Sequence, residues 1–305
     1  MGRDRGGAPV SASTAQWLEG ARLRTLPAAV SPVLAGSGVA IFHRAFAPLL
    51  AVLCLIVALA LQVGVNFAND YSDGIRGTDA DRVGPLRLVG SGTVAPATVK
   101  AAAFGCFGAA AIAGLAITAL TGQWWLIGVG IAAILAAWYY TGGKRPYGYA
   151  GLGEVFVLIF FGLVATAGTA LVQTGFGSGA AWSHALLASL AIGLLACAIL
   201  MANNLRDIAG DAAVGKKTLA VRLGDRRSRA GYLVLIVAAA AACIALAATS
   251  TWWALLALLF VPVAAPAVRT VLAGATGRPL IGVLKLTGLA ELACAVGMLV
   301  GLALG

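Results

Sequence analysis

Nine apolar segments, each close to the length that a helix needs to cross a bilayer, constrain this chain most strongly. A hydrocarbon core requires about 20 mainly apolar residues per helix. Turn-forming pairs such as Ala47-Pro48 and Thr121-Gly122 separate the segments. The segments cover approximately residues 25–42, 47–70, 97–120, 123–141, 152–174, 184–206, 230–248, 251–272 and 280–304. We therefore expect an all-α integral membrane protein with nine transmembrane helices. They would form a single bundle around a central cavity that opens near the cytoplasmic face.

Composition supports lipid as the solvent of most of the chain. Of the 305 residues, 61% are hydrophobic and only 10% are charged, whereas a soluble globular domain carries about 25% charged residues. Only the first stretch is polar throughout, and it lacks the pattern of a cleaved secretory signal. We interpret residues 1–16 as a polar N-terminal tail and residues 17–305 as one membrane domain.

The distribution of basic residues predicts the orientation. If the N-terminus is cytoplasmic, 20 of the 21 Lys and Arg residues fall in cytoplasmic loops or at cytoplasmic helix ends, and only Arg44 does not. Basic residues that flank membrane spans stay in the cytoplasm, so we expect a multi-pass protein of the plasma membrane. The net charge of +10 follows from this bias and from attraction to anionic lipid. Because the charges lie in short loops, we expect no nucleic-acid partner.

Two polar stripes stand at the cytoplasmic ends of the predicted second and sixth helices. Each stripe contains one asparagine and two aspartates, spaced so that they share one face of an α-helix. The first stripe is Asn66, Asp70 and Asp73, and the second is Asn203, Asp207 and Asp211. Helix ends that emerge into water can be polar without further purpose. However, ionised groups at membrane depth are costly and usually serve a site, and two matched stripes favour function.

The ligands in the stripes suit a hard cation. Carboxylate and amide oxygens are typical for Mg²⁺ or Ca²⁺, and a bound cation would offset the unfavourable helix dipole at a C-terminal end. Basic residues surround the stripes: Arg76, Arg82, Arg87, Lys144, Arg145, Arg206, Lys216 and Lys217. Acids, a divalent metal and Arg or Lys are the arrangement expected for a diphosphate. In a membrane this predicts a substrate with an apolar tail, such as a polyprenyl diphosphate.

Longer stretches around the stripes make the prediction more specific. They are Asn69–Asp79 (NDYSDGIRGTD) with Gly84–Gly92 (GPLRLVGSG), Arg145–Glu154 (RPYGYAGLGE), and Asn203–Asp211 (NNLRDIAGD) with Gly215–Gly224 (GKKTLAVRLG). With the stripes, these resemble the UbiA superfamily of intramembrane prenyltransferases, and within it the MenA branch that acts on 1,4-dihydroxy-2-naphthoate. The resemblance implies Mg²⁺-dependent transfer, with Mn²⁺ as a possible substitute. A polyprenyl chain would pass from its diphosphate to this aromatic acceptor, giving demethylmenaquinone, CO₂ and diphosphate in menaquinone synthesis.

The resemblance also implies roles for individual residues. By motif position, the predicted metal ligands are Asn66, Asp70, Asp73, Asn203, Asp207 and Asp211. The four aspartates among them are also predicted to be catalytic. Predicted substrate contacts are Asn66, Asn69, Arg76, Lys144, Arg145, Tyr147, Asn203, Arg206 and Lys216. This chain departs from the superfamily pattern, in which the next aspartate would follow Asp70 by four residues. Gly74 occupies that position, and Asp73 follows Asp70 by only three residues. It therefore stays open whether Asp73, Asp79 or Asp81 completes the first metal site.

The acceptor side is less defined by the sequence. Glu154 is a candidate to receive the proton of a phenol, although an acid at a helix N-terminus is also favoured by the dipole. Interfacial anchoring is an alternative role for Tyr147. Arg22 or Arg24 is a candidate to pair with the acceptor's carboxylate.

Three other functions make different demands on the sequence. Another branch of the superfamily would use a different acceptor, such as hydroxybenzoate. A transporter would more typically carry its acids near the bilayer midplane on broken helices. A CDP-alcohol phosphotransferase would need Asp-Gly-x-x-Ala-Arg, whereas here Asp73-Gly74-Ile-Arg is followed by Gly77-Thr78.

Overall fold

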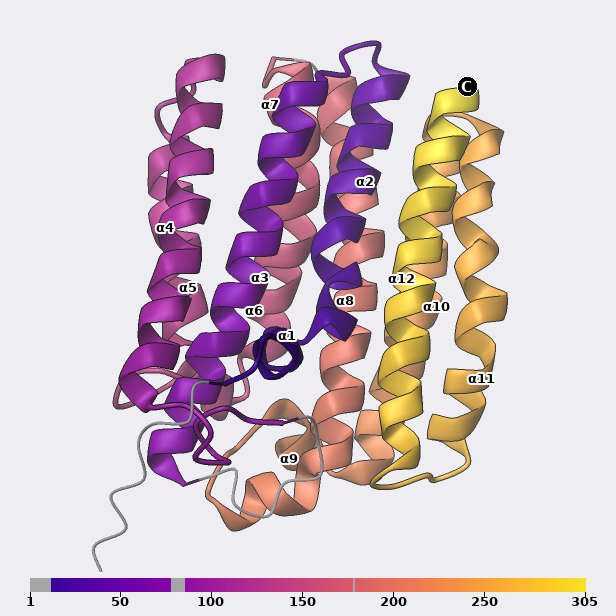
Figure 1. Cartoon of the computed structure of the whole chain (residues 1–305). Coiled ribbons are helices and arrows are strands. Elements are labelled where there is room, and N and C mark those ends of the chain that lie inside the picture. The colour runs from indigo at the N-terminus through magenta and orange to yellow at the C-terminus, as the bar shows by residue number, and fades with distance from the viewer. Residues whose placement is uncertain (1–11, 78–85, 178) are drawn as a thin grey trace, which may run out of the picture.

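The computed structural model describes residues 12–77, 86–177 and 179–305, and within these ranges the chain is helical with no strand. Figure 1 shows long helices standing side by side in one bundle. The predicted all-α membrane fold is confirmed. Of the residues predicted above, Asp79, Asp81, Arg82 and most of the N-terminal tail (1–11) lie outside the described residues. Within the remainder of that tail, α1 (Thr14–Ala21) already begins, capped by Ser13.

The other α-helices are α2 (Pro27–Phe42), α3 (Pro48–Arg76), α4 (Pro96–Thr121), α5 (Leu126–Tyr139), α6 (Gly153–Val157), α7 (Gly168–Thr174), α8 (Gly179–Ala213), α9 (Leu219–Leu223), α10 (Asp225–Thr249), α11 (Phe260–Leu272) and α12 (Pro279–Leu304). A π-helical stretch, Leu158–Ala167, joins α6 to α7 into one continuous span. The 3₁₀ stretches are Leu23–Thr25, Tyr147–Ala150 and Trp252–Leu259.

All nine apolar segments are helical, but they differ in their capacity to span a membrane. Seven of them in the described chain are long and apolar enough to cross. Together α1 and α2 make an eighth if the pair, bent by 48°, counts as one span. The remaining helix, α5, has only 14 residues. The structure is thus that of a multi-pass integral membrane protein.

Two helices continue past the ends predicted from hydropathy. The second segment was expected to end near residue 70, but α3 runs to Arg76 and stops where Gly77 adopts a left-handed conformation (φ 69°). Such a C-terminal glycine satisfies the last carbonyl groups without the steric cost of a Cβ. Likewise, α8 continues past residue 206 to Ala213. Both polar stripes therefore lie on continuous helix.

The centre of the bundle is α8, which lies between the group α3–α5 and the group α10–α12 in Figure 1. Its apolar span is 67% buried, the largest share among the candidate spans. Small residues allow helices to approach closely in a membrane, where packing replaces the hydrophobic effect. Gly193 of α8 packs directly on the π-helical stretch, since a Cβ there would lie 2.9 Å from the Cα of Gly162.

Candidate functional site

A cavity of about 1110 Å³ runs along the inside of the bundle between α3, α5, the π-helical stretch and α8. Aspartates and asparagines line one end, whereas Trp125, Phe176 and Trp182 line the other. Both Trp182 and Asp207 belong to α8, and at about 1.5 Å per residue they lie about 37 Å apart along its axis. The cavity therefore has a polar end and a long apolar section.

The stripe on α8 faces the cavity as a unit. All three of its members, Asn203, Asp207 and Asp211, line the polar end. Arg206 holds two of them, because its Nε and Nη2 donate to the two carboxylate oxygens of Asp207, both at 2.6 Å. Its Nη2 also donates to Oδ1 of Asn203 at 2.9 Å. The arginine thus fixes two of the three side chains of this stripe from within the same helix.

The stripe on α3 is divided between the cavity and a neighbouring loop. Asp73 lines the cavity, whereas Asp70 does not. The carboxylate of Asp70 is buried and accepts hydrogen bonds from the backbone N–H groups of Leu88 (2.7 Å) and Val89 (3.1 Å). Asp70 therefore holds the loop that precedes α4 against α3. This attachment brings Arg87, the neighbour of Leu88, to the cavity wall.

Two asparagines complete the α3 contribution. Asn69 lines the cavity, and its Oδ1 accepts a hydrogen bond from the Thr141 hydroxyl at 2.7 Å. Asn66 also lines the cavity, but its Nδ2 donates to the backbone oxygen of Ala21 (2.9 Å) and to Oγ1 of Thr25 (3.1 Å). Both amide hydrogens of Asn66 are thereby used to hold the connection between α1 and α2.

The two stripes meet through Lys216, in the segment between α8 and α9. Its Nζ lies 3.7 Å from Oδ1 of Asp73 and 3.9 Å from Oδ1 of Asp211, so one ammonium contacts carboxylates of both stripes. The same Nζ lies 4.6 Å from the ring centroid of Tyr149, whose hydroxyl donates to Oδ1 of Asp73 at 2.5 Å. Arg87 reaches Oδ2 of Asp73 at 3.5 Å. Carboxylates and cations from four separate parts of the chain thus form one polar site.

Comparison with known proteins identifies the family of this chain. The sequence model of the UbiA prenyltransferase family matches residues 29–279. The chain belongs to the UbiA prenyltransferase family. A relative from Mycobacterium tuberculosis (strain ATCC 25618 / H37Rv), named 1,4-dihydroxy-2-naphthoate octaprenyltransferase, is 49% identical over 294 residues, which covers 96% of this chain and 99% of the relative. The resemblance to UbiA proteins and to their MenA branch is confirmed.

Solved structures of UbiA homologs share the fold. The apo structure of a UbiA homolog from Aeropyrum pernix K1 superposes with a TM-score of 0.66 at 18% identity, covering 91% of this chain and 97% of that one. A UbiA homolog from Archaeoglobus fulgidus bound to GPP and Mg²⁺ gives a TM-score of 0.62 at 15% identity, covering 95% and 100%.

Three of the predicted cationic contacts lie outside the cavity of this UbiA protein. Lys144 and Arg145 are exposed, and neither belongs to the cavity lining. Arg76 donates to the backbone oxygens of Thr141 and Gly143 and lies over the ring of Tyr149, 5.4 Å from its centroid. Arg76 therefore supports the segment that follows α5 and approaches the site only through Tyr149.

Two of the residues predicted for the acceptor side, Tyr147 and Glu154, also differ in placement. Tyr147 lines the cavity, and its hydroxyl donates to the backbone oxygen of Ala136 at 2.8 Å. Burial raises the pKa of Tyr147 above its usual value, so it remains a neutral donor. Glu154 is buried outside the cavity lining, where its Oε1 accepts from Nδ2 of Asn204 at 3.0 Å. Its contact is with α8 rather than with the cavity.

The polar residues that line the cavity without having been among the predicted substrate contacts include Gln62, Arg87, Asn204 and Lys285. Arg87 carried a signal, since it lies in the GPLRLVGSG stretch, but its contact with Asp73 depends on the fold of that loop. Gln62 carried a different one, because an amide inside an apolar helix is costly and usually has a purpose. It stands one turn before Asn66 and extends that polar face into the membrane.

Proposed function

We propose that this protein is a Mg²⁺-dependent 1,4-dihydroxy-2-naphthoate polyprenyltransferase that acts in the cytoplasmic membrane. The observation that carries the proposal is the meeting of two acidic stripes, bridged by Lys216, at the polar end of a long apolar cavity. That shape suits a diphosphate head with an isoprenoid tail. The choice of acceptor rests on the name of the M. tuberculosis relative; hydroxybenzoate is the alternative.

The reaction exchanges one bond for another at the prenyl carbon. The C–O bond to diphosphate breaks and the leaving group takes the electron pair, while the electron-rich ring forms the new C–C bond. The carboxylate leaves as CO₂ and its bonding electrons stay with the ring. The product is the prenylated naphthalenediol, which is the reduced form of demethylmenaquinone. Because CO₂ departs in place of a proton, the net change requires no base at the ring, in accord with the position of Glu154 outside the cavity.

The donors at the polar end fit Mg²⁺. They are hard oxygens from Asp73, Asp207, Asp211 and Asn203. Within the ranges that the structure describes, no three acidic, His or Cys side chains are grouped closely enough to hold an ion by themselves. Mg²⁺ tolerates this, because it commonly binds through one or two carboxylates and completes its shell with waters and substrate phosphates. The A. fulgidus homolog bound to GPP and Mg²⁺ supports this assignment, and Mn²⁺ suits the same ligands.

Asp73, Asn203, Asp207 and Asp211 would hold Mg²⁺, which would supply Lewis-acid assistance to the departure of the diphosphate. Arg87, Arg206 and Lys216 take the remaining negative charge through charge-assisted hydrogen bonds. Asp70 and Asn66 act one step away from the substrate, by holding the Arg87 loop and the α1–α2 connection. The apolar section, with the π-helical Phe160 and Phe161 on its wall, holds the tail and keeps water from the allylic cation.

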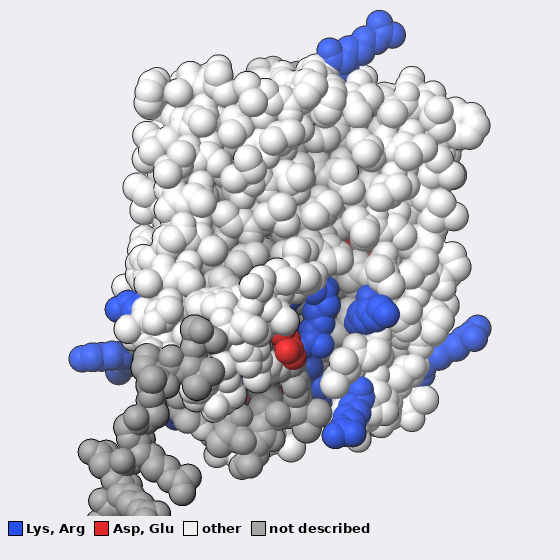
Figure 2. Space-filling view, in the orientation of Figure 1, with Lys and Arg blue, Asp and Glu red and all other residues white. Residues whose placement is uncertain are grey.

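We propose that the polar end is cytoplasmic. Lys and Arg gather over the lower half of the face in Figure 2, on the side of α9 in Figure 1, and little positive charge is visible at the opposite end. Positive residues at span ends stay in the cytoplasm. In this topology residues 17–305 form one membrane domain, with the bent α1–α2 pair and α5 as the eighth and ninth membrane segments.

An assay on the purified protein in lipid tests the function. It contains Mg²⁺, a polyprenyl diphosphate, and either 1,4-dihydroxy-2-naphthoate or 4-hydroxybenzoate. A prenylated naphthalenediol with release of CO₂, lost with EDTA and in Asp73→Ala and Asp207→Ala, supports the proposal. Arg145→Ala is the control, because this exposed residue lies outside the cavity. Turnover of hydroxybenzoate alone would assign another branch of the family. Absence of turnover and of Mg²⁺-dependent diphosphate binding would favour a transporter.

A further inference from the structure

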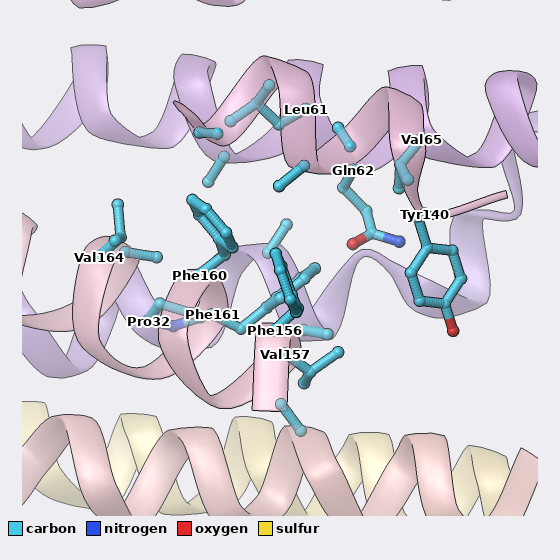
Figure 3. A pocket seen from close by; sticks show the side chains of 18 of the residues that line it. Pro32, Leu61, Gln62, Val65, Tyr140, Phe156, Val157, Phe160, Phe161 and Val164 are labelled. Carbon is cyan, nitrogen blue, oxygen red and sulfur yellow. The ribbon is translucent and has the colours of Figure 1, made fainter. Parts of the chain in front are cut away.

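Gln62 is a buried amide on the cavity wall, deeper in the membrane than the acidic site. It lies two turns before Asn69 on α3, which is about 10 Å along the helix axis. Its side chain is 6% exposed and lines the cavity. In Figure 3 it reaches from α3 towards the side of Phe156 and Val157, with Tyr140 beside it.

The hydrogen bonds around Gln62 determine which way its amide points. Nε2 lies 3.0 Å from Oγ1 of Thr25. The Thr25 hydroxyl gives its only hydrogen to the backbone oxygen of Arg22 at 2.9 Å, and it also accepts from Nδ2 of Asn66. Thr25 can therefore only accept from Gln62, so the NH₂ group of Gln62 faces Thr25 and Oε1 faces away.

Oε1 of Gln62 is buried and has no hydrogen-bond partner among the described residues. Buried acceptors are almost always paired, because an unpaired one forfeits the hydrogen bond it made in water. On a cavity wall, a ligand that carries a hydrogen-bond donor would supply the missing partner. Oε1 of Gln62 is thus a fixed hydrogen-bond acceptor that an O–H or N–H group of a ligand could satisfy.

Of the substrates in the proposed reaction, only the aromatic acceptor carries such a donor at this depth. An isoprenoid tail has no polar hydrogen, and the ionised diphosphate is itself an acceptor that belongs with the cations at the polar end. Aromatic rings lie near Gln62 (Figure 3). Phe156 stacks on Tyr147 with 3.9 Å between ring centroids, and it also stacks on Phe160 with 6.1 Å between centroids. These rings offer a flat surface to another aromatic ring.

The same hydrogen-bond network presents cations for a carboxylate. Thr25 belongs to the connection between α1 and α2, and its contact with Gln62 joins α3 to that connection. Arg22 and Arg24 of the same connection line the cavity. A guanidinium matches a carboxylate in geometry and charge. An acceptor for a hydroxyl and donors for a carboxylate thus lie on one wall, which corresponds to the polar groups of a hydroxynaphthoate.

We propose that Gln62 is a specificity-determining residue of the acceptor subsite. Its Oε1 accepts a hydrogen bond from a ring hydroxyl of the aromatic acceptor, whose carboxylate lies at the Arg22–Arg24 connection. The inference rests on the proposed function, since it assumes a hydroxylated aromatic carboxylate as substrate.

The test compares Gln62→Met with the unaltered protein on three ligands. They are 1,4-dihydroxy-2-naphthoate and its two analogues that each lack one hydroxyl, 1-hydroxy-2-naphthoate and 4-hydroxy-2-naphthoate, used as competitors. In the unaltered protein, the analogue without the bonded hydroxyl should bind roughly 10- to 100-fold more weakly than the parent, as for the loss of one buried hydrogen bond. In Gln62→Met the parent should weaken by the same factor, so that this analogue and the parent bind alike. The KM for polyprenyl diphosphate should not change.

Thr25→Ser is the matched control, because it keeps the hydroxyl that accepts from Nε2 and therefore keeps the direction of the Gln62 amide. It should keep the difference in binding between parent and analogue. The inference is overturned if Gln62→Met retains that difference, or if it raises the KM for polyprenyl diphosphate to the same extent. If the unaltered protein does not prenylate dihydroxynaphthoate at all, the proposed function itself has failed.

Discussion

Replacement of Lys216 by methionine tests the central contact of the site. The Lys216 side chain is 11% exposed, and its Nζ contacts Asp73 and Asp211, of which the side chains are 5% and 16% exposed. At this degree of burial, solvent screening is too weak to cancel the charge. In the proposed reaction this ammonium turns to the leaving diphosphate, whose charge grows as the C–O bond breaks.

The expected loss follows from the strength of such a contact. A hydrogen bond to a charged group contributes about 1.5–3 kcal/mol, which corresponds to a fall of about 10- to 150-fold in kcat/KM for the polyprenyl diphosphate. The Mg²⁺ concentration for half-maximal activity should not rise, because the variant removes a cation that competes for Asp73 and Asp211. Lys216→Arg keeps the charge and should recover part of the activity.

Lys217→Met provides a control with the same change of net charge. Lys217 follows Lys216 directly but has an exposed side chain outside the cavity lining, so its loss should alter kcat/KM by about 2-fold or less. Steady-state kinetics in lipid at fixed Mg²⁺ compare the two variants. Equal losses in both would mean that overall positive charge, and not the Lys216 contact, supports catalysis, and the reasoning would be refuted.

Three further perturbations follow from the structure. Asp70→Ala removes the acceptor for two backbone N–H groups, so we expect a loss of about 1–3 kcal/mol in unfolding free energy together with reduced turnover, measured by thermal unfolding and assay; unchanged stability would contradict this. Phe176→Ala opens the apolar end of the cavity, where Phe176 packs on Trp125 at 4.9 Å, and should shift preference towards longer prenyl diphosphates in a competition assay; an unaltered chain-length profile would argue against a wall there. Since burial raises the pKa of Tyr147, its stabilising contact is fully present below the unfolded value of about 10 and is lost only as pH rises through the raised one. If the free energy of unfolding of the unaltered protein falls between pH 7 and 9, it should therefore fall in the same way in Tyr147→Phe. Absence of that fall in the variant would refute the assignment.

The apolar segments were predictable because each is close to the bilayer-spanning length and ends at turn residues. The ends of α3 and α8 were not, since hydropathy falls before the helix stops. Gly77 ends α3, and this depends on its left-handed backbone rather than on polarity.

Spacing along one helix predicted that Asn203, Asp207 and Asp211 share one face of α8, and all three line the cavity. It failed to separate Asp70 from Asp73. Three residues apart, both belong to a broad polar face, and only the return of the loop at Leu88 and Val89 assigns Asp70 to backbone N–H groups. Such a contact depends on tertiary structure, which a periodic pattern does not contain.

The short helix α5 has a consequence for the surrounding lipid. Its 14 residues span about 21 Å, less than the hydrocarbon thickness of about 30 Å. Trp124 and Trp125, which precede it, are 65% and 53% exposed, and such residues prefer the headgroup level. The resulting hydrophobic mismatch favours a locally thinned bilayer along this flank. Because α5 forms one wall of the cavity, the headgroup layer of the bilayer would lie closest to the reaction site along this flank. An amphiphile with a charged head would therefore meet the protein there.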